Sequence, residues 1–360
     1  MQGRASTPGT VTLIGSGEMA PSMARVHREL MARIAGPVRP VFVDTPAGFQ
    51  LNADELSGRA VEYFRERFDR DLYVASYKAR GEAQEATAEA VGRLRWANYI
   101  FAGPGSPTYA VRNWQDTPVY DAMARSLAGG AHLAFASAAA IAMSRYALPV
   151  YEIYKVGAEP HWLDGLDLLG TYGADLAIVP HWNNSEGGTH DTRYAFIGEP
   201  RFRTLEERLP DSAIVLGIDE YTACTVDLEH ERCLVYGAGQ VTVRHRGHET
   251  HYPVGSTFEL DRLRTPSHDR QEIASLSAMA ATGTEPGATL PQPFPQWNGQ
   301  PCTDEEELAL ITPYVDLLVS VRTGLREARQ WEFADRIRDR LGALGILLED
   351  GPDGTTWRRA

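Results

Sequence analysis

Short apolar runs alternate with amphipathic segments through residues 11–219, and this alternation limits the chain to few folds. VTLIGSG at 11–17 and PVFVDT at 40–45 are two such runs, and helical patterns cover 53–68 and 82–97. Apolar runs separated by helices are typical of a parallel sheet with helices packed on its faces. We therefore expect an α/β fold with a mostly parallel sheet flanked by helices. Further strands are expected at 71–77, 99–105, 132–137, 175–181 and 213–219.

The pattern changes after Ile218, where apolar and polar residues alternate in segments such as RCLVYGAGQVTVRHRG. This alternation, with Gly at the turns, predicts antiparallel strands. Residues 280–303 are dense in Pro, Gly and Thr, which is the composition of a linker. We expect an α/β domain at 1–265, a linker at 266–303, and at 304–360 a small helical C-terminal domain that ends in a short β segment.

The charge and the cysteine content limit the possible partners and the cellular compartment. A formal net charge of −13 argues against broad nucleic-acid binding, because phosphates repel an acidic surface. The cysteines Cys224, Cys233 and Cys302 form no C-x-x-C motif and fit a reducing compartment. No run approaches the roughly 18 apolar residues that span a bilayer, and the N-terminus lacks the apolar core of a signal peptide. We expect a cytoplasmic protein with no membrane partner.

Two strand ends carry residues suited to acyl transfer. FAGPGSP at 101–107 is a Gly-rich loop, which can expose backbone N–H groups to a ligand. AFASAAAIAM at 134–143 places Ser137 at a turn from strand to helix, where a serine hydroxyl projects clear of the sheet. The alternatives are a plain turn for the loop and a helix N-cap for Ser137.

A third strand end is followed by PHWNNSEGGTHDTR at 180–193. A histidine titrates near neutral pH and can take a serine proton and return it, which predicts His181 as a base for Ser137. The rival interpretation is a metal site built from His181, Glu186, His190 and Asp191. Their spacing is not H-E-x-x-H and no cysteine lies near, so we expect no metal.

These features occur in the order found in the S51 serine peptidases, which include dipeptidase E and cyanophycinase, and most of residues 10–250 resembles that family. The resemblance implies a class I glutamine-amidotransferase-like fold with a catalytic triad. In it Ser137 is the nucleophile, His181 the base, and Glu152, in LPVYEIYKVG, the acid that orients the histidine. Glu159 and Asp164 remain alternatives for the acid.

The same resemblance implies an oxyanion hole made of the Gly105 and Ala138 backbone N–H groups. The chain departs from the family's G-x-S-A-G-A run, because Phe135 and Ala139 stand where the family has glycines. The chemistry needs no cofactor. The substrate implied is a small peptide or an aminoacyl compound. The loops with Glu18 and Gln50 follow the first two expected strands, and they either shape a substrate pocket or are ordinary turns between strand and helix. Further substrate-binding residues are predicted in the loop after His181: Asn183, Glu186, His190 and Arg193.

The last residues carry an unrelated pattern. ADRIRDRLGALGILLEDGPDGTTW at 334–357 resembles the C-terminal end of bacterial cysteinyl-tRNA synthetases, where the segment helps to hold tRNA. The synthetase's catalytic domain is absent from this chain. Arginines crowd the preceding helical sequence, either as a solvated face or as phosphate contacts. The RNA-binding candidates are Arg326, Arg329, Arg336 and Arg338.

Two classes of function follow. The first is a serine hydrolase or acyl transferase acting on an amide or ester. The second is a catalytically impaired pseudoenzyme whose C-terminal domain binds tRNA or a synthetase. The two combine if the tail presents a charged tRNA whose aminoacyl ester Ser137 attacks. A tail that serves instead as a packing or homodimerisation module is the remaining alternative.

Overall fold

The computed structural model describes residues 7–264 and parts of the C-terminal region. The chain forms two compact units, Met1–Ala288 and Thr289–Ala360. The predicted linker at 266–303 lies outside the described residues, so its boundaries stay a prediction. In the C-terminal unit the described residues are Val319, Arg322, Thr323, Arg326, Asp335, Ile337, Arg338, Leu341, 346–351 and 354–359.

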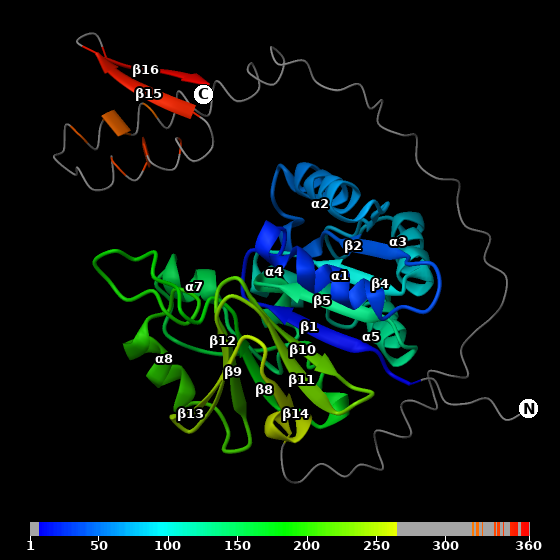
Figure 1. The fold of residues 1–360 in the computed structure, drawn as a ribbon. Coiled ribbons are helices and arrows are strands. Elements are labelled where there is room, and N and C mark those ends of the chain that lie inside the picture. Colours follow the sequence, from blue (N-terminus) through cyan, green and yellow to red (C-terminus); the bar gives the residue numbers. More distant parts are fainter. Residues whose placement is uncertain are drawn as a thin grey trace, which may run out of the picture. The chain divides into compact units, whose positions relative to one another are not determined.

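An eight-stranded mixed sheet forms the centre of the N-terminal unit (Figure 1). Its strands are β1 Thr10–Ile14, β2 Pro40–Val43, β3 Tyr73–Ala75, β4 Tyr99–Ala102, β5 His132–Ala136, β10 Thr222–Asp227, β11 Arg232–Gly237 and β14 Thr257–Glu259. They lie in the order β14-β11-β10-β1-β5-β4-β2-β3. Strands β1, β5, β4, β2 and β3 are parallel, whereas β10, β11 and β14 run antiparallel to their neighbours. The expected α/β fold with a mostly parallel, helix-flanked sheet is confirmed.

A second, four-stranded sheet departs from the expected single sheet. It contains β8 Leu176–Val179, β9 Ile214–Ile218, β12 Gln240–His245 and β13 His248–Pro253, in the order β13-β12-β9-β8. The segments expected to extend the main sheet, β8 and β9, pair with each other here. They cannot add beside β1, because β10 occupies that side of β1 along its whole length. The antiparallel strands predicted after Ile218 are confirmed in both sheets. A short ladder pairs β6 Tyr146–Ala147 with β7 Leu163–Asp164.

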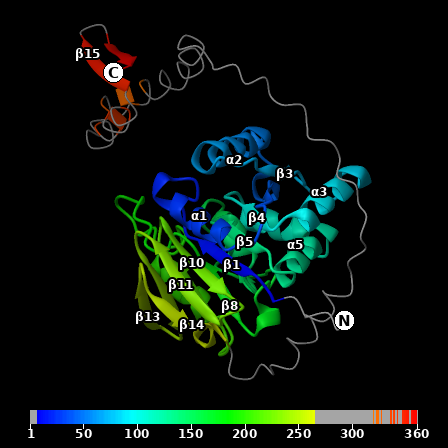
Figure 2. The same cartoon turned by 45° about the vertical axis from the view of Figure 1, so that its right-hand side comes forward.

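Helices cover both faces of the main sheet (Figure 2). On one face α1 Ala24–Ala32 and α2 Ala53–Phe68 pack over Phe42 and Phe101. On the other, α3 Gln84–Trp96, α4 Pro107–Trp114 and α5 Pro118–Ala128 bury a larger core that includes Phe135. The helices predicted at 53–68 and 82–97 correspond to α2 and α3. The remaining elements are α6 Ala138–Ala142, α7 Val150–Tyr154, α8 Glu199–Glu206 and the 3-10 turns Pro21–Met23, Thr45–Ala47, Gly170–Tyr172 and Leu260–Leu263.

The C-terminal unit ends in a two-stranded antiparallel hairpin of β15 Ile346–Gly351 and β16 Gly354–Arg359. Leu341 and Ile346 are its buried apolar residues among those described, and Val319, Ile337 and Trp357 pack against them. Arg322 is also buried, and its guanidinium donates to Thr355 Oγ1 at 3.3 Å. Part of the arginine-rich helical sequence therefore packs against the hairpin instead of facing solvent.

In the part of the chain that the structure describes, every helix is too short or too polar to cross a membrane.

Candidate active site

Ser137 occupies a sharp turn between β5 and α6. Its backbone has φ 51° and ψ −113°, a combination that costs a non-glycine residue about 1–3 kcal/mol. The turn is held because the Ser137 N–H donates to the Ile14 carbonyl of β1 at 3.0 Å. Ser137 is the N-cap residue of α6 by position, but its side chain makes no capping hydrogen bond. Its hydroxyl is instead directed at a histidine.

The absence of the two family glycines does not prevent this turn. Phe135 lies within β5, between Leu13 of β1 and Ala102 of β4, and its side chain is fully buried in the larger core. Ala139 is fully buried in the first turn of α6. The unusual backbone angles fall on Ser137 itself, so neither neighbour needs the conformational freedom of glycine.

His181 follows β8 and links Ser137 to an acid. Its Nε2 lies 2.9 Å from Ser137 Oγ, and its Nδ1 lies 3.0 Å from Glu220 Oε1. In the tautomer that suits both contacts, Nδ1–H donates to the carboxylate and Nε2 accepts from the serine hydroxyl. His181 also has a positive φ of 50°, and its carbonyl accepts from the Ala195 N–H at 3.3 Å. Both ends of the Ser137–His181 contact thus sit on strained backbone.

Glu220 follows β9, the strand beside β8, and is fixed by two asparagines. Asn184 Nδ2 donates to Glu220 Oε1 at 2.9 Å, and the Glu220 N–H donates to Asn183 Oδ1 at 2.8 Å. The hydrogen bond from His181 lowers the pKa of Glu220, burial opposes it, and the Asn184 contact adds to the lowering. Glu220 is therefore held in the ionised form that can orient a histidine.

The structure corrects the predicted acid: Glu220, not Glu152, contacts His181. Glu152 lies in α7, and its Oε2 is buried without a hydrogen-bond partner in the described part of the chain. Among the alternatives, Glu159 is exposed and Asp164 is an exposed residue of β7. The physical reason is topological: the acid reaches His181 from the adjacent parallel strand β9, not from the connection that follows α6. The sequence signal for Glu220 was an acid two residues after an apolar strand, in IDEY.

The Gly-rich loop after β4 packs closely against the 3-10 turn that follows β2. A Cβ added to Gly105 would lie 1.9 Å from the Pro46 carbonyl oxygen, so only glycine fits there. The Ser106 N–H donates to that same oxygen at 2.9 Å. Within residues 7–264 the N–H groups of Gly105 and Ala138 donate to no protein acceptor, so both are available to a ligand oxygen.

An unusual run of left-handed backbone shapes one wall beside His181. Tyr194, Ala195 and Phe196 have φ values of 59°, 54° and 69°, although such geometry costs an L-residue roughly 1–2 kcal/mol. The run brings the Phe196 ring to 5.9 Å from the His181 ring and 5.4 Å from the Tyr154 ring of α7. The result is an aromatic surface next to the histidine.

The other predicted substrate-binding residues fall into two groups. Gln50 is half-buried after the 3-10 turn, and Glu186 and His190 are exposed on the loop that follows His181. Asn183 and Arg193 already have protein partners: Asn183 holds the Glu220 backbone, and Arg193 binds Asp191 through Nε at 3.0 Å and Nη2 at 2.9 Å.

Two of the residues in the rival metal interpretation, His181 and Asp191, are engaged by other protein groups. The hydrogen bonds from Arg193 hold the pKa of Asp191 well below its usual range and occupy both of its oxygens. His181 is shared by Ser137 and Glu220. Among the described residues, no group of three or more His, Cys, Asp or Glu side chains is placed to hold a metal.

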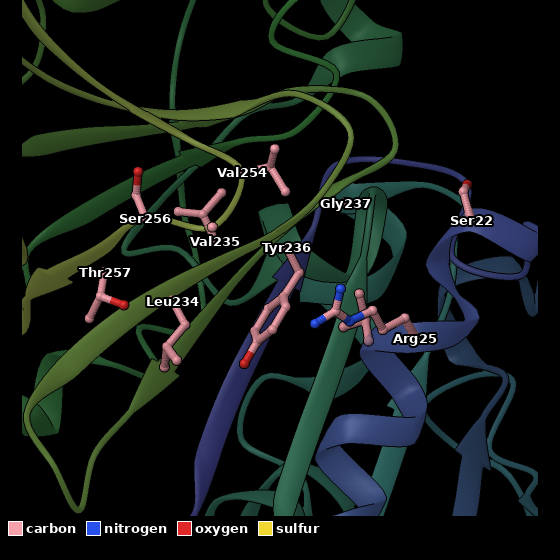
Figure 3. Close-up of a pocket in the computed structure, with 11 residues that line it drawn as sticks. Ser22, Arg25, Leu234, Val235, Tyr236, Gly237, Val254, Ser256 and Thr257 are labelled. Carbon is pink, nitrogen blue, oxygen red and sulfur yellow. The ribbon is translucent and has the colours of Figure 1, made fainter.

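A separate cavity of about 280 Å³ lies between the start of α1 and β11. Figure 3 shows Arg25 of α1 facing Tyr236 of β11 across it, with Val254 and Ser256 on a further side. The cavity does not include Ser137, His181 or Glu220.

The RNA-binding candidates are described only in part. Arg326 and Arg338 are helical, and Arg338 lies 3.2 Å from Asp335. Arg329 and Arg336 lie outside the described residues.

Comparisons with known proteins identify relatives of two kinds. No family model matches the chain. Cysteine–tRNA ligases of Yersinia enterocolitica and Klebsiella pneumoniae are 38% and 40% identical to it over 107 residues. Each alignment covers 28% of this chain and 21% of the ligase, so the chain spans about a fifth of the length of these relatives. Part of the chain is homologous to cysteine–tRNA ligases, as the sequence predicted.

Among solved structures, a peptidase from an acI-B1 Actinobacterium matches with a TM-score of 0.56 and 21% identity, covering 71% of this chain and 98% of the peptidase. The match falls mostly in the N-terminal unit, because the C-terminal unit is too short to hold it. A putative peptidase E protein from Listeria monocytogenes EGD-e matches with a TM-score of 0.43 and 15% identity over 64% of this chain, too little to establish a shared fold. The N-terminal unit therefore has the fold of a solved peptidase.

Proposed function

We propose that residues 7–264 form a serine hydrolase or acyl transferase that acts on an amide or ester bond. The observation that carries the proposal is the chain of contacts from Ser137 Oγ to His181 Nε2 and from His181 Nδ1 to Glu220, built on a strained strand-to-helix turn. A nucleophile, a base and an orienting acid in this order are the parts that acyl transfer needs. The peptidase fold of this unit supports the same chemistry.

In the proposed reaction Ser137 Oγ attacks the carbonyl carbon while His181 Nε2 takes the hydroxyl proton. Glu220 keeps the ring in the tautomer that can accept this proton and stabilises the imidazolium that results. The N–H groups of Gly105 and Ala138 stabilise the oxygen that becomes negative. When the tetrahedral intermediate collapses, the leaving amine or alcohol takes the proton from His181, and Ser137 keeps the acyl group. Water then repeats the sequence and releases the acid.

The substrate class we propose is a small peptide or an aminoacyl compound. Tyr154 and Phe196 offer aromatic surface beside His181, and the Phe49 ring lies tilted against Tyr109 of α4 with 5.1 Å between the ring centroids. Such surfaces bind the apolar parts of small acyl groups.

The proposal is tested with a fluorophosphonate probe, which reacts with activated serines. Wild-type protein is expected to be labelled and Ser137→Ala to stay unlabelled. Ser185→Ala is the matched control, because Ser185 is an exposed serine on the loop after His181. Labelling that survives Ser137→Ala, or its absence from wild-type protein, would contradict the proposal.

The homology to cysteine–tRNA ligases favours a second function, in which the C-terminal unit binds tRNA or a synthetase. We propose Arg326 and Arg338 as phosphate contacts among the described residues. The two functions combine if the bound tRNA carries an aminoacyl ester that Ser137 attacks. In the alternative, the N-terminal unit is catalytically impaired and only the binding remains.

Binding of full-length protein to tRNA is expected to weaken steeply as salt rises, because each phosphate contact releases a counterion. Replacing Arg326 and Arg338 together by Gln should weaken binding and make the salt slope shallower by about one to two units. Arg67→Gln with Arg70→Gln, on the exposed side of α2 and just after it, is the matched control. Salt-independent affinity, or equal losses in the two double variants, would contradict a tRNA-binding role.

A further inference from the structure

Glu18 is a buried acid that the proposed mechanism does not use. It follows β1 and is 7% exposed. A Cβ added to Gly103, directly after β4, would lie 3.9 Å from Glu18 Oε1. Because β5 lies between β1 and β4 in the sheet, Glu18 and Gly103 follow the two strands that flank β5, the strand that Ser137 follows. The carboxylate therefore lies beside the start of the Gly103–Gly105 loop, at the same edge of the sheet as the nucleophile turn.

Two contacts fix the backbone around Glu18. Fully buried His27 of α1 donates from Nε2 to the Glu18 carbonyl at 2.7 Å, and its Nδ1 accepts from Tyr99 Oη at 2.6 Å. Next to it, Gly17 has φ 65° and lies against the Tyr221 ring, where a Cβ would come within 2.4 Å of a ring carbon. The backbone turn that carries Glu18 is therefore held in a fixed conformation.

The Glu18 carboxylate has few partners in the protein. Within residues 7–264 no side chain donates a hydrogen bond to it, and the His181 ring is close enough to act on it electrostatically. Burial raises the pKa of the Glu18 carboxyl, while its own N–H and the nearby His181 lower it. A buried carboxylate with so little compensation is costly unless a proton or a cation neutralises it.

The position of this charge creates a conflict with acyl transfer. The Gly105 N–H is proposed to stabilise a developing oxyanion, and an uncompensated carboxylate beside the same loop would repel that oxyanion. Repulsion between unit charges in a poorly solvated site is far stronger than in water. A cationic group on the substrate removes the repulsion and adds attraction to Glu18.

We infer that Glu18 is a specificity-determining residue that pairs with an ammonium group on the acyl part of the substrate. The inference rests on the proposed function, because it places the ammonium next to the carbonyl that Ser137 attacks. An α-ammonium is present in a peptide with a free N-terminus and in an aminoacyl ester. A side-chain ammonium, as in lysine, is the other source of the same chemistry. Acyl groups with an acidic side chain are disfavoured at this site.

The test measures equilibrium binding, so that it does not depend on turnover. Full-length Ser137→Ala protein is titrated by calorimetry with three amidated dipeptides: alanyl-alaninamide, N-acetyl-alanyl-alaninamide and N-acetyl-lysyl-alaninamide. The first carries an α-ammonium, the second has no charge, and the third carries a side-chain ammonium. At least one cationic peptide is expected to bind about 10-fold tighter than the neutral one, the scale of a hydrogen bond to a charged group.

Glu18→Gln, added to Ser137→Ala, keeps the shape and removes the charge, and the preference should fall to about twofold or less. Glu66→Gln, an exposed acid on α2, is the matched control and should leave the preference unchanged. Equal binding of all three peptides, binding of none, or a preference that survives Glu18→Gln would overturn the inference. The fluorophosphonate experiment is scored independently, so failure of the proposed function and failure of this inference remain distinguishable.

Discussion

The strand ends that meet at the candidate site come from two different sheets. Ser137 follows β5 in the main sheet, whereas His181 and Glu220 follow β8 and β9 in the second sheet. The first end is a turn into α6, embedded in a fully buried Ala-rich segment. The second opens into a loop with exposed Asn183, Glu186 and His190. The nucleophile is thus set by core packing, and the base and acid are set by hydrogen bonds between loops.

Ser137 and His181 share one property, which is a strained backbone conformation. Ser137 has φ 51° and His181 has φ 50°, and neither is a glycine. Backbone strain of this kind persists only where the surroundings enforce it, and it concentrates at functional sites. In each sheet a strained backbone conformation therefore positions a reactive group, although the packing around the two groups differs.

The largest effect is expected at the acid supplied by the second sheet. Glu220→Gln should lower turnover about 10³-fold, because the neutral amide no longer fixes the His181 tautomer or stabilises its charged form. Glu152→Gln is the matched control within the connection after α6, and it should change turnover by no more than about twofold. Both are measured as kcat on whichever ester or amide the wild-type protein cleaves.

The reverse result would contradict the assignment of the acid to the second sheet. If Glu152→Gln inactivated the protein and Glu220→Gln did not, then the acid would come from the main-sheet side and the β8–β9 pairing would not build the site. Retention of fluorophosphonate labelling at full rate in Glu220→Gln would argue in the same direction.

The role of core packing at the end of β5 in the main sheet is tested by substitution. Phe135→Ala should destabilise the N-terminal unit by about 3 kcal/mol, because it removes a fully buried aromatic ring from the larger core. Tyr73→Ala, at a residue of β3 that is 36% exposed, is the comparison variant and should cost much less. Chemical denaturation gives both values. A Phe135→Ala protein as stable as wild type would contradict the role of this ring in supporting the turn.

The fold was largely predictable because buried parallel strands leave a clear apolar pattern. Every strand expected before Ile218 exists, and the α2 and α3 segments were located from their periodicity. The division into two sheets was not predictable from that pattern. Runs such as 175–181 and 213–219 look the same in either sheet, and the antiparallel pairing of β10 with β1, which keeps them from that side of β1, is not visible in them.

The candidate site was predictable where a residue lies one or two positions after the end of a strand. Ser137 and His181 were found in this way, and Glu220 obeys the same rule. It was missed because the acid was sought between the serine and the histidine in sequence, whereas the fold supplies it from the strand beside β8. Glu18 shows a further limit: its position after β1 was visible, but its reach to Gly103 depends on the strand order.

The smallest expected effect is the contribution of Glu220, at the second sheet, to the pH dependence of folding stability. The pKa of Glu220 is lowered in the folded protein, chiefly by the hydrogen bond from His181. A depressed folded pKa contributes stability that is fully present above the unfolded pKa of about 4.3 and is lost as pH falls through the folded value. Wild-type protein should therefore be more stable than Glu220→Gln at pH 6, with the difference shrinking below about pH 4.

Thermal melting of the two proteins between pH 3 and 7 measures this difference, and Glu66→Gln controls for the loss of one exposed acid. The effect should stay modest because Glu220 is only partly buried and water screens its charge. A constant difference across the whole range would mean that the Gln variant loses packing and not an ionic contact. A difference that grew as the pH fell would mean that Glu220 is not held ionised by His181. In that case the two asparagines, not the histidine, would be the groups that fix this end of the site.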